Sequence, residues 1–384
     1  MDIETLSVVI FFGIIGILIY LDKKNIEFKK GLIVRRTRKG IQIISEIARK
    51  YRKVLLYVGN FAVGLCIVAS IVGLYFLVRG TLSGERSAGV ILPTVGEYQY
   101  PGPVYSVPFW YWIIAIFIIV TVHEPMHALF ARLERIKIKE MGVFLFFVFP
   151  VGAFADPDEN EMKKLSTMKK LRIFAAGSFG NIIVAGIFIL LIMSYDFLVG
   201  SLIEGDGVIF EKTIENTGAQ QADLSGIITE IDGNEIKSLK DLSEVMNNVK
   251  PGDTIEVKTT QGIFEIETTQ NPDNIERPFI GISNPSTLFV YKGFLSNFGV
   301  VSQRTLQVLY WVLGLLGWLF VLNLGVGIFN LFPIKPLDGG LMFEEIIKHF
   351  YKGRFVSYIV NGVSLLILSL LLTNLFGPSI FGLT

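Results

Sequence analysis

Two of the three histidines in the chain, His123 and His127, are four residues apart. On a helix this spacing places both imidazoles on one face, where they can bind a single Zn²⁺ ion. Glu124 lies between them, close enough to deprotonate a metal-bound water. The segment therefore predicts a hydrolytic zinc site with Glu124 as its acid/base group.

The residues around this segment are apolar, from about 107 to 133, which is long enough to span a bilayer. An HExxH match by chance is the alternative interpretation. Ionisable groups are costly in hydrocarbon, at ~2.5–3.5 kcal/mol for a carboxylate, and persist there only when paired, solvated or ligated. The setting thus favours a metal site, and it favours hydrolysis of peptide bonds within the bilayer.

The composition of the 384-residue chain, 51% hydrophobic and 18% charged, predicts a multi-pass α-helical membrane protein with some soluble mass. A net charge of +1 gives no bias toward nucleic acid, and we expect no such partner. The single cysteine, Cys66, lies in an apolar run and is expected to be buried packing. Because acidic Asp2 and Glu4 precede the first apolar run, we expect a retained span there and not a cleaved signal.

Six apolar runs are long enough to cross a bilayer as helices, and a further run, 141–155, is too short. Proline and glycine interrupt the end of this short run, so it is expected to be re-entrant or strand-like, with a buried interfacial loop as the alternative. The six expected spans are about 6–21, 54–78, 107–133, 173–200, 308–332 and 355–377.

Lysine and arginine are concentrated in particular connections between the spans. Twelve lie in 22–53 and nine in 132–172, whereas 79–107 has two. By the positive-inside rule, these basic connections and 348–354 are cytoplasmic. We therefore expect the N-terminus and residues 201–305 on the extracytoplasmic side of the cell membrane.

Residues 203–285 are polar, with period-2 runs at 254–258 and 263–267 separated by turn signals. One helical stretch runs from Leu239 to Val249. This pattern predicts a small β-rich domain inserted between two membrane spans.

A zinc site with an open position needs a third protein ligand, and the candidate is Asp338. The apolar stretch 308–343 is too long for one straight span, and prolines and glycines interrupt its second half. We expect the span to break near its cytoplasmic end and to direct this carboxylate back into the protein. An ordinary loop aspartate is the alternative.

Four motifs in this order resemble the site-2 protease family of intramembrane zinc metalloproteases, over about residues 107–345. They are the HExxH segment at 123–127, the stretch 152–159, Gly177-Ser178-Phe179-Gly180-Asn181, and the N-x-x-P-x-x-P-L-D-G segment at 330–339.

The resemblance implies one zinc per chain, bound by His123, His127 and Asp338, with Glu124 as general acid/base. It implies that Asn181 orients the substrate or stabilises the oxyanion, with a helix–helix hydrogen bond as the alternative role. Further substrate-binding positions under this resemblance are Gly152, Phe154, Gly177 and Asn330.

Two residues depart from the family pattern. Pro125 removes the hydrogen bond to the carbonyl of Thr121 and is expected to kink the helix. Met126 replaces a glycine that is frequent before the second histidine, which changes the room around the metal.

The inserted segment resembles a circularly permuted PDZ domain, through motifs at 207–210, 216–222 and 227–234. In this resemblance the strand Phe279-Ile280-Gly281-Ile282 is similar to the loop that receives a peptide carboxyl terminus. Asp223-Leu224 departs from the pattern, and a groove that only shields the active site is the alternative.

The function expected from these patterns is hydrolysis of transmembrane segments of other membrane proteins, after an earlier cut by an upstream site-1-type protease. A metal transporter and a catalytically inactive scaffold are the alternatives, and His349 is expected to be solvated surface. The expected segments are two N-terminal spans at 1–78, catalytic core segments at 107–200 and 305–345, the PDZ-like domain at 203–285, and a last span at 355–384.

Overall fold

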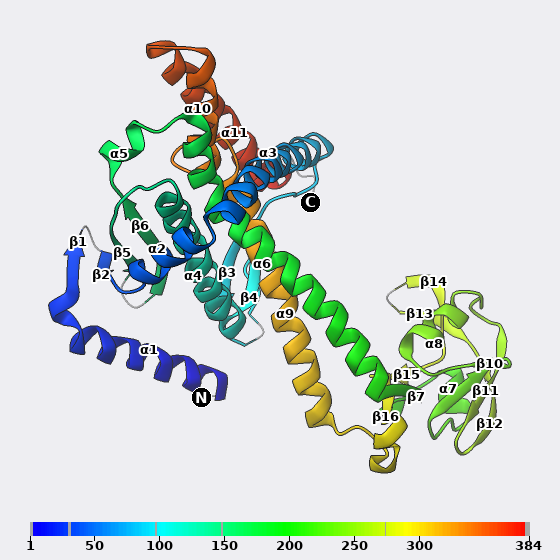
Figure 1. Cartoon of the computed structure of the whole chain (residues 1–384). Helices are drawn as coiled ribbons and strands as arrows, with labels where there is room; N and C mark the ends of the chain where they lie inside the picture. Colours follow the sequence, from blue (N-terminus) through cyan, green and yellow to red (C-terminus); the bar gives the residue numbers. More distant parts are fainter. Residues whose placement is uncertain (1–2, 30–31, 97, 147–148, 273, 381–384) are drawn as a thin grey trace. The chain divides into compact units, whose positions relative to one another are not determined.

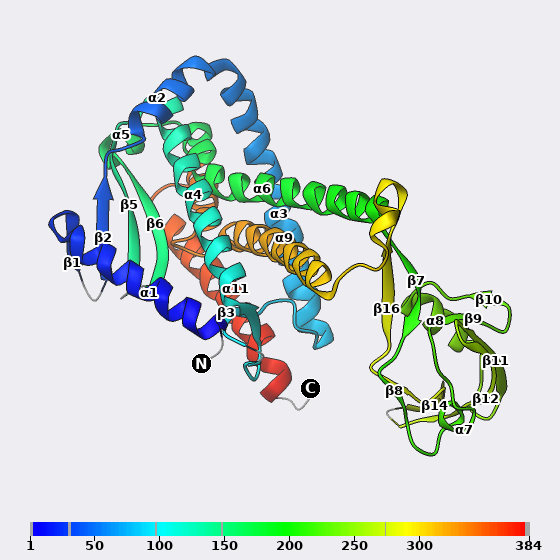
Figure 2. The same cartoon turned by 90° about the horizontal axis from the view of Figure 1, so that it is seen from below.

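The computed structural model describes residues 3–29, 32–96, 98–146, 149–272 and 274–380 (Figures 1 and 2). Its contacts divide the chain into two units. Unit 1 comprises Met1–Leu190 and Leu315–Thr384, and unit 2 comprises Leu191–Gly314. The expected core segments and the expected inserted domain thus fall largely in different units.

Within the described residues, six helices are long and apolar enough to cross a membrane, and each coincides with one of the expected spans. Many of their apolar side chains are exposed, which suits helices solvated by lipid. The helices are α1 (Ile3–Leu21), α3 (Arg52–Ser83), α4 (Phe109–Leu133), α6 (Thr167–Leu202), α9 (Gln303–Asn330) and α11 (Arg354–Ile380).

A four-stranded antiparallel sheet accompanies these helices in unit 1, in the order β1-β2-β5-β6. Its register pairs Val34 with Phe144 and Gly142 with Phe154, and β6 is an edge strand. The strands are β1 (Ile26–Lys29), β2 (Leu32–Thr37), β5 (Ile138–Phe146) and β6 (Phe149–Pro157).

The short apolar run at 141–155 therefore forms most of the β5–β6 hairpin, apart from residues 147–148, which lie outside the described residues. This is the strand-like form of the expectation, while its depth in a membrane stays a prediction. The strands β1 and β2 and the amphipathic helix α2 (Ile41–Lys50) were not expected in the basic connection 22–53.

Unit 1 also contains α10 (Asp338–Phe350), the short α5 (Glu159–Lys163), a parallel pair β3 (Val90–Thr94) and β4 (Val104–Pro108), and the 3-10 turn η1 (Lys23–Asn25). One core cluster joins α3, α6 and α10 around the fully buried Cys66, as expected for a packing cysteine. Its members are Ala62, Val63, Cys66, Leu171, Ala175, Phe179, Leu331 and Met342.

Unit 2 contains a sheet in the order β12-β11-β9-β7-β16, with β10 paired to β9, and two separate strand pairs, β13–β14 and β15–β8. The bounds are β7 (Ile203–Ile209), β8 (Lys212–Thr213), α7 (Gly218–Gln221), β9 (Ile228–Ile231), β10 (Asn234–Glu235), α8 (Leu239–Met246), β11 (Thr254–Thr259), β12 (Gly262–Glu267), β13 (Thr269–Asn271), β14 (Asn274–Phe279), β15 (Ile282–Ser283), β16 (Ser286–Tyr291) and η2 (Gly293–Phe298).

The period-2 pattern of this unit is reflected in its burial. Alternate residues of β11, beginning with Ile255 and Val257, are buried, and they pack with Ile231 and Ile266 in one apolar core. The expected helix at Leu239–Val249 is present but ends at Met246.

The prediction of a single strand at Phe279-Ile280-Gly281-Ile282 is wrong. Phe279 ends β14, Ile282 begins β15, and Gly281 between them has φ +96°. A Cβ at Gly281 would lie 2.0 Å from Oγ1 of Thr217, so only glycine fits this turn.

Candidate metal centre and active site

Helix α4 carries both histidines of the HExxH segment on one face. It continues through Pro125 to Leu133 as one helix. The side chains of His123 and His127 are 12% and 16% exposed. The helix thus presents two nearly buried imidazoles side by side, as the spacing of four residues predicts.

Asp338 reaches the histidines because the chain breaks between α9 and α10. Helix α9 ends at Asn330, and Asp338 is the first residue of α10. A Cβ at Gly339 would lie 1.9 Å from the carbonyl oxygen of Leu331, and one at Gly340 would lie 2.5 Å from the carbonyl carbon of Ile334. The two glycines therefore allow the connecting loop to pack closely against the first turn of α10, which places the carboxylate.

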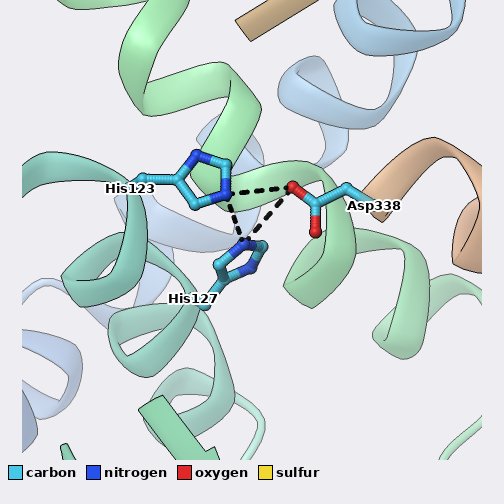
Figure 3. Close-up of side chains that lie close together, drawn as sticks. All are labelled: His123, His127 and Asp338. Carbon is cyan, nitrogen blue, oxygen red and sulfur yellow. Dashed lines mark hydrogen bonds and ion pairs between the residues drawn. The ribbon is translucent and has the colours of Figure 1, made fainter. Parts of the chain in front are cut away.

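The three side chains converge on one point (Figure 3). The two Nε2 atoms of His123 and His127 are 3.2 Å apart, and each lies 3.3 Å from Oδ2 of Asp338. Ligand atoms at about 2.0–2.1 Å from a tetrahedral zinc ion lie about 3.3–3.4 Å from one another. The spacing of these three atoms fits three corners of a zinc tetrahedron, with the fourth corner open for water or substrate.

Gly177 of α6 leaves the room that the cluster needs. A Cβ at this position would lie 2.3 Å from Nε2 of His127 and 2.7 Å from Nε2 of His123. Any side chain at this position would collide with the two imidazoles. Only glycine therefore allows α6 to pack this close to the centre.

Helix α6 also supplies hydrogen-bond partners to the cluster. Nδ1 of His127 lies 2.7 Å from the carbonyl oxygen of Ile173, which can only accept a hydrogen bond. Nδ1 therefore carries the proton, and Nε2 is left with the lone pair that a metal requires. Ser178 donates to Oδ2 of Asp338 at 3.1 Å.

Glu124 is held by the sheet. Its Oε2 accepts a hydrogen bond of 3.0 Å from the backbone N–H of Ala155 in β6. Because Ala155 directs this N–H toward α4 and away from β5, the free edge of the sheet faces the helix that carries the HExxH segment.

A small hollow of about 160 Å³ opens beside Glu124, between α4 and the sheet. Its walls are mostly apolar and include Val120, Pro125, Val143 and Phe154. The aromatic ring of Phe154 is fixed against that of Phe144, with 4.8 Å between the ring centroids. The hollow and the free sheet edge therefore adjoin the same carboxylate.

Met126, one of the two departures from the family pattern, is accommodated by the neighbouring helix α6. A Cβ at Gly180 would lie 2.8 Å from Cγ of Met126, so the methionine side chain occupies space that this glycine leaves free. Met126 thereby packs into the interface between α4 and α6.

The remaining predicted residues lie in several places. Gly152 pairs with Phe144 in the β5–β6 hairpin, and Asn330 is the last residue of α9. His349 is exposed near the end of α10, as expected. The stretch Phe279–Ile282 belongs to unit 2 and is no part of the metal cluster.

Ser178 is the residue at this centre that sequence reasoning missed. It lies inside the Gly177–Asn181 motif, between the glycine and the asparagine that were singled out. Its position next to Gly177 was the available signal, but a serine in a span is as readily a helix–helix contact.

Comparison with known proteins places this geometry in a family. The family model described as Peptidase family M50 matches residues 111–372, more than half of the chain, and this range contains all three cluster residues and Glu124. The chain belongs to peptidase family M50. This is the family of the site-2 proteases, so the resemblance seen in the motifs is confirmed.

This M50 chain aligns with two relatives over most of their length. An uncharacterized protein of Methanocaldococcus jannaschii is 27% identical in an alignment 371 residues long that covers 93% of this chain and 90% of the relative. A protein of Clostridium perfringens named "Putative zinc metalloprotease" is 24% identical in an alignment 312 residues long that covers 66% of this chain and 91% of the relative.

Among solved structures, the PDZ domain of an SdrC-like protein from Listeria monocytogenes is 30% identical over 20% of this chain and 85% of its own length, with a TM-score of 0.18. A TM-score at this level does not establish a shared fold. The family assignment and the span-like helices make the chain a multi-pass membrane protein of a metalloprotease family for which zinc is the implied metal.

Proposed function

We propose that this chain is an intramembrane zinc endopeptidase that hydrolyses peptide bonds within transmembrane segments of other proteins. The observation that carries the proposal is the convergence of His123, His127 and Asp338 at 3.2–3.3 Å, on and beside a helix apolar enough to span a membrane. One zinc ion per chain would be held there, and when bound it polarises a carbonyl group and lowers the pKa of water.

Glu124 would move the protons. A carboxylate next to the ligands can take a proton from the attacking water and pass it to the leaving amine. The hydrogen bond from the N–H of Ala155 occupies Oε2 and leaves Oε1 available for this transfer. The sheet would therefore orient the acid/base group as well as bind substrate.

Asn181 would position His123 in addition to any contact with substrate. Nδ2 of its side-chain amide lies 3.1 Å from Nδ1 of His123, and its Oδ1 is buried without a hydrogen-bond partner among the described residues. When the amide oxygen faces Nδ1, it accepts the Nδ1 proton, the buried oxygen gains its partner, and Nε2 keeps the lone pair for the metal. The present orientation, with Nδ2 facing Nδ1, would place the proton on Nε2 and prevent metal binding, so zinc binding requires the amide group to flip.

The substrate would bind as an extended strand along β6. A transmembrane helix hides its peptide bonds in backbone hydrogen bonds, so it has to unwind before cleavage. Ala153 directs backbone groups to the free edge beside α4, where a strand can add to the sheet, while the N–H of Ala155 remains bound to Glu124. The apolar hollow lined by Val120, Pro125 and Phe154 would then receive one apolar side chain of that strand.

The inserted segment at 203–285 would act as a filter. The lysine- and arginine-rich connections favour the cytoplasmic side for the span ends that they join, so the N-terminus and this segment would lie outside. A folded domain there would exclude substrates with bulky outer portions, so an upstream site-1-type protease would trim them first. Its sheet edge and the turn at Phe279–Ile282 would be candidates for holding the new carboxyl terminus.

The alternatives have weaker support. A transporter needs several ligand groups along a path, whereas the described residues contain one cluster of metal-ligand type. An inactive scaffold would have no need for the acid/base group, which is present beside the ligands.

Zinc content tests the proposal. Purified wild-type protein should hold about one zinc per chain by elemental analysis, and His123→Ala should lose it. Asn181→Ala should weaken zinc affinity by roughly 10–100-fold, because the partner that fixes the ligand is gone. His349→Ala removes an exposed histidine outside the cluster and should leave zinc unchanged. Equal zinc in all four proteins would contradict the assignment.

A further inference from the structure

A hollow lined by arginines lies in unit 1 where two span-like helices end. Helix α2 leads directly into α3, and the hollow of about 680 Å³ is formed by α2, the start of α3 and the end of α4. Four arginines line it, against one carboxylate, that of Glu46. The arginines are Arg49, Arg52, Arg132 and Arg135.

Two of these arginines are fixed in place by the protein. Nε of Arg132 donates to Oγ of Ser45 at 2.9 Å and its Nη1 donates to the carbonyl of Ile136 at 3.1 Å, while Arg52 donates to the carbonyl of Leu133. Arg49 and Arg135 are exposed, and neither forms an ion pair with a described residue. The hollow therefore combines two arginines held in fixed positions with two guanidinium groups that are available to an anion.

One exposed stripe of α2 is apolar and suits contact with a membrane surface. Ile43, Ile47 and Tyr51 follow at intervals of four residues and are 64%, 39% and 48% exposed. The apolar surface continues on α3 with the exposed Val54 and Tyr57. Ile44 packs into the core on the adjoining side of α2, whereas Ser45 and Arg49 line the arginine hollow on the side opposite the exposed stripe. A helix of this kind lies in the interface plane, beside the headgroups.

A second basic hollow, of about 620 Å³, lies at the other end of α2. It is lined by Arg38, Lys39, Lys137 and Lys139, of which Lys139 lies 3.7 Å from Asp158. Basic side chains therefore lie beside α2 in both hollows.

We propose that the surface of α2 and its two hollows binds anionic phospholipids. The guanidinium groups of Arg49 and Arg135 would hold the lipid phosphate, for which their planar donor geometry is suited. The hollow lies where α3 begins and α4 ends, so the acyl chains of a lipid held there would run along the exposed Val54 and Tyr57 of α3, which free phosphate would leave exposed. A phospholipid satisfies both the charge and this apolar surface, and the inference does not depend on the peptidase reaction.

The test compares lipid retention by full-length protein in detergent, measured by native mass spectrometry with phosphatidylglycerol and phosphatidylcholine as probes. Wild type should retain phosphatidylglycerol in preference to phosphatidylcholine. Arg49→Gln/Arg135→Gln should lower the affinity for phosphatidylglycerol by roughly tenfold or more, because charges near the surface contribute most of the preference.

Lys163→Gln/Lys164→Gln is the matched control, since it removes two exposed charges from α5 and its end, outside both hollows. It should retain lipid like the wild type. Equal retention of the two lipids by wild type, an equal loss in the control, or full displacement of the lipid by millimolar inorganic phosphate would each overturn the proposal. Circular dichroism of both variants separates lost binding from lost folding.

Discussion

Replacing Glu124 with glutamine is expected to lower the rate of peptide cleavage by about 10² or more, while zinc stays bound. The amide keeps the shape of the side chain but cannot accept a proton from water. General acid/base catalysis contributes on the order of 10²–10⁴ to such rates. The measurement is turnover of a single-span substrate by purified protein, with zinc content determined on the same samples.

Glu140→Gln is a matched control for this change. Glu140 lies in the same sheet, on β5, and forms an ion pair of 3.1 Å with Arg36 away from the metal cluster. The Glu140→Gln variant should cleave the substrate at close to the wild-type rate. Near-normal turnover in the Glu124 variant would remove this residue from the mechanism, whereas loss of zinc would make it a structural support of the metal site.

Replacing Gly177 with alanine is expected to abolish zinc binding and cleavage together. The new Cβ would lie 2.3 and 2.7 Å from the two Nε2 atoms of His127 and His123, so the ligands could not keep their places. Elemental analysis and turnover of the same preparation measure the effect.

Gly186→Ala provides the control on the same helix. Nothing lies within 4 Å of a Cβ at Gly186, so the substitution meets no obstacle there. It should keep zinc and activity, and it should be neutral or stabilise folding by about 0.5–1 kcal/mol. A Gly177→Ala protein that retained one zinc per chain would contradict the geometry of the centre.

The candidate ligands of this centre were predictable because each of them follows from a local rule. The spacing of His123 and His127 requires only a helix, and the break before Asp338 follows from prolines and glycines in an apolar stretch. The span-like helices follow from hydropathy in the same way. These are properties of single segments, which a sequence carries directly.

Properties that depend on two segments were not predictable from the residues alone. The need for glycine at Gly177 arises from the approach of α6 to α4, and the hydrogen bond between Ala155 and Glu124 depends on the register of the β5–β6 hairpin. Strands β1 and β2 could not be recognised in the sequence. Charged residues interrupt their apolar patterns, such as Arg35 and Arg36 in β2. Strand β2 pairs with β5, and β1 pairs with β2.

The prediction at Phe279–Ile282 failed for a related reason. The residues are apolar and β-prone, apart from Gly281, and read as one continuous strand. The positive φ of Gly281 bends the chain, and Ile282 then pairs with Thr213 of β8 while Phe279 pairs with Thr269 of β13. A glycine within such a run indicates a bend as readily as a strand.

The measurement that tests the central claim most directly is the mapping of cleavage sites in a single-span polypeptide with a short outer tail. Both proteins are reconstituted in bilayer nanodiscs, and mass spectrometry identifies the new termini. Zinc-loaded wild-type protein should produce termini within the apolar span, and removal of zinc should abolish them. Cuts confined to the soluble flanks, or cuts within the span that persist without zinc, would contradict the account.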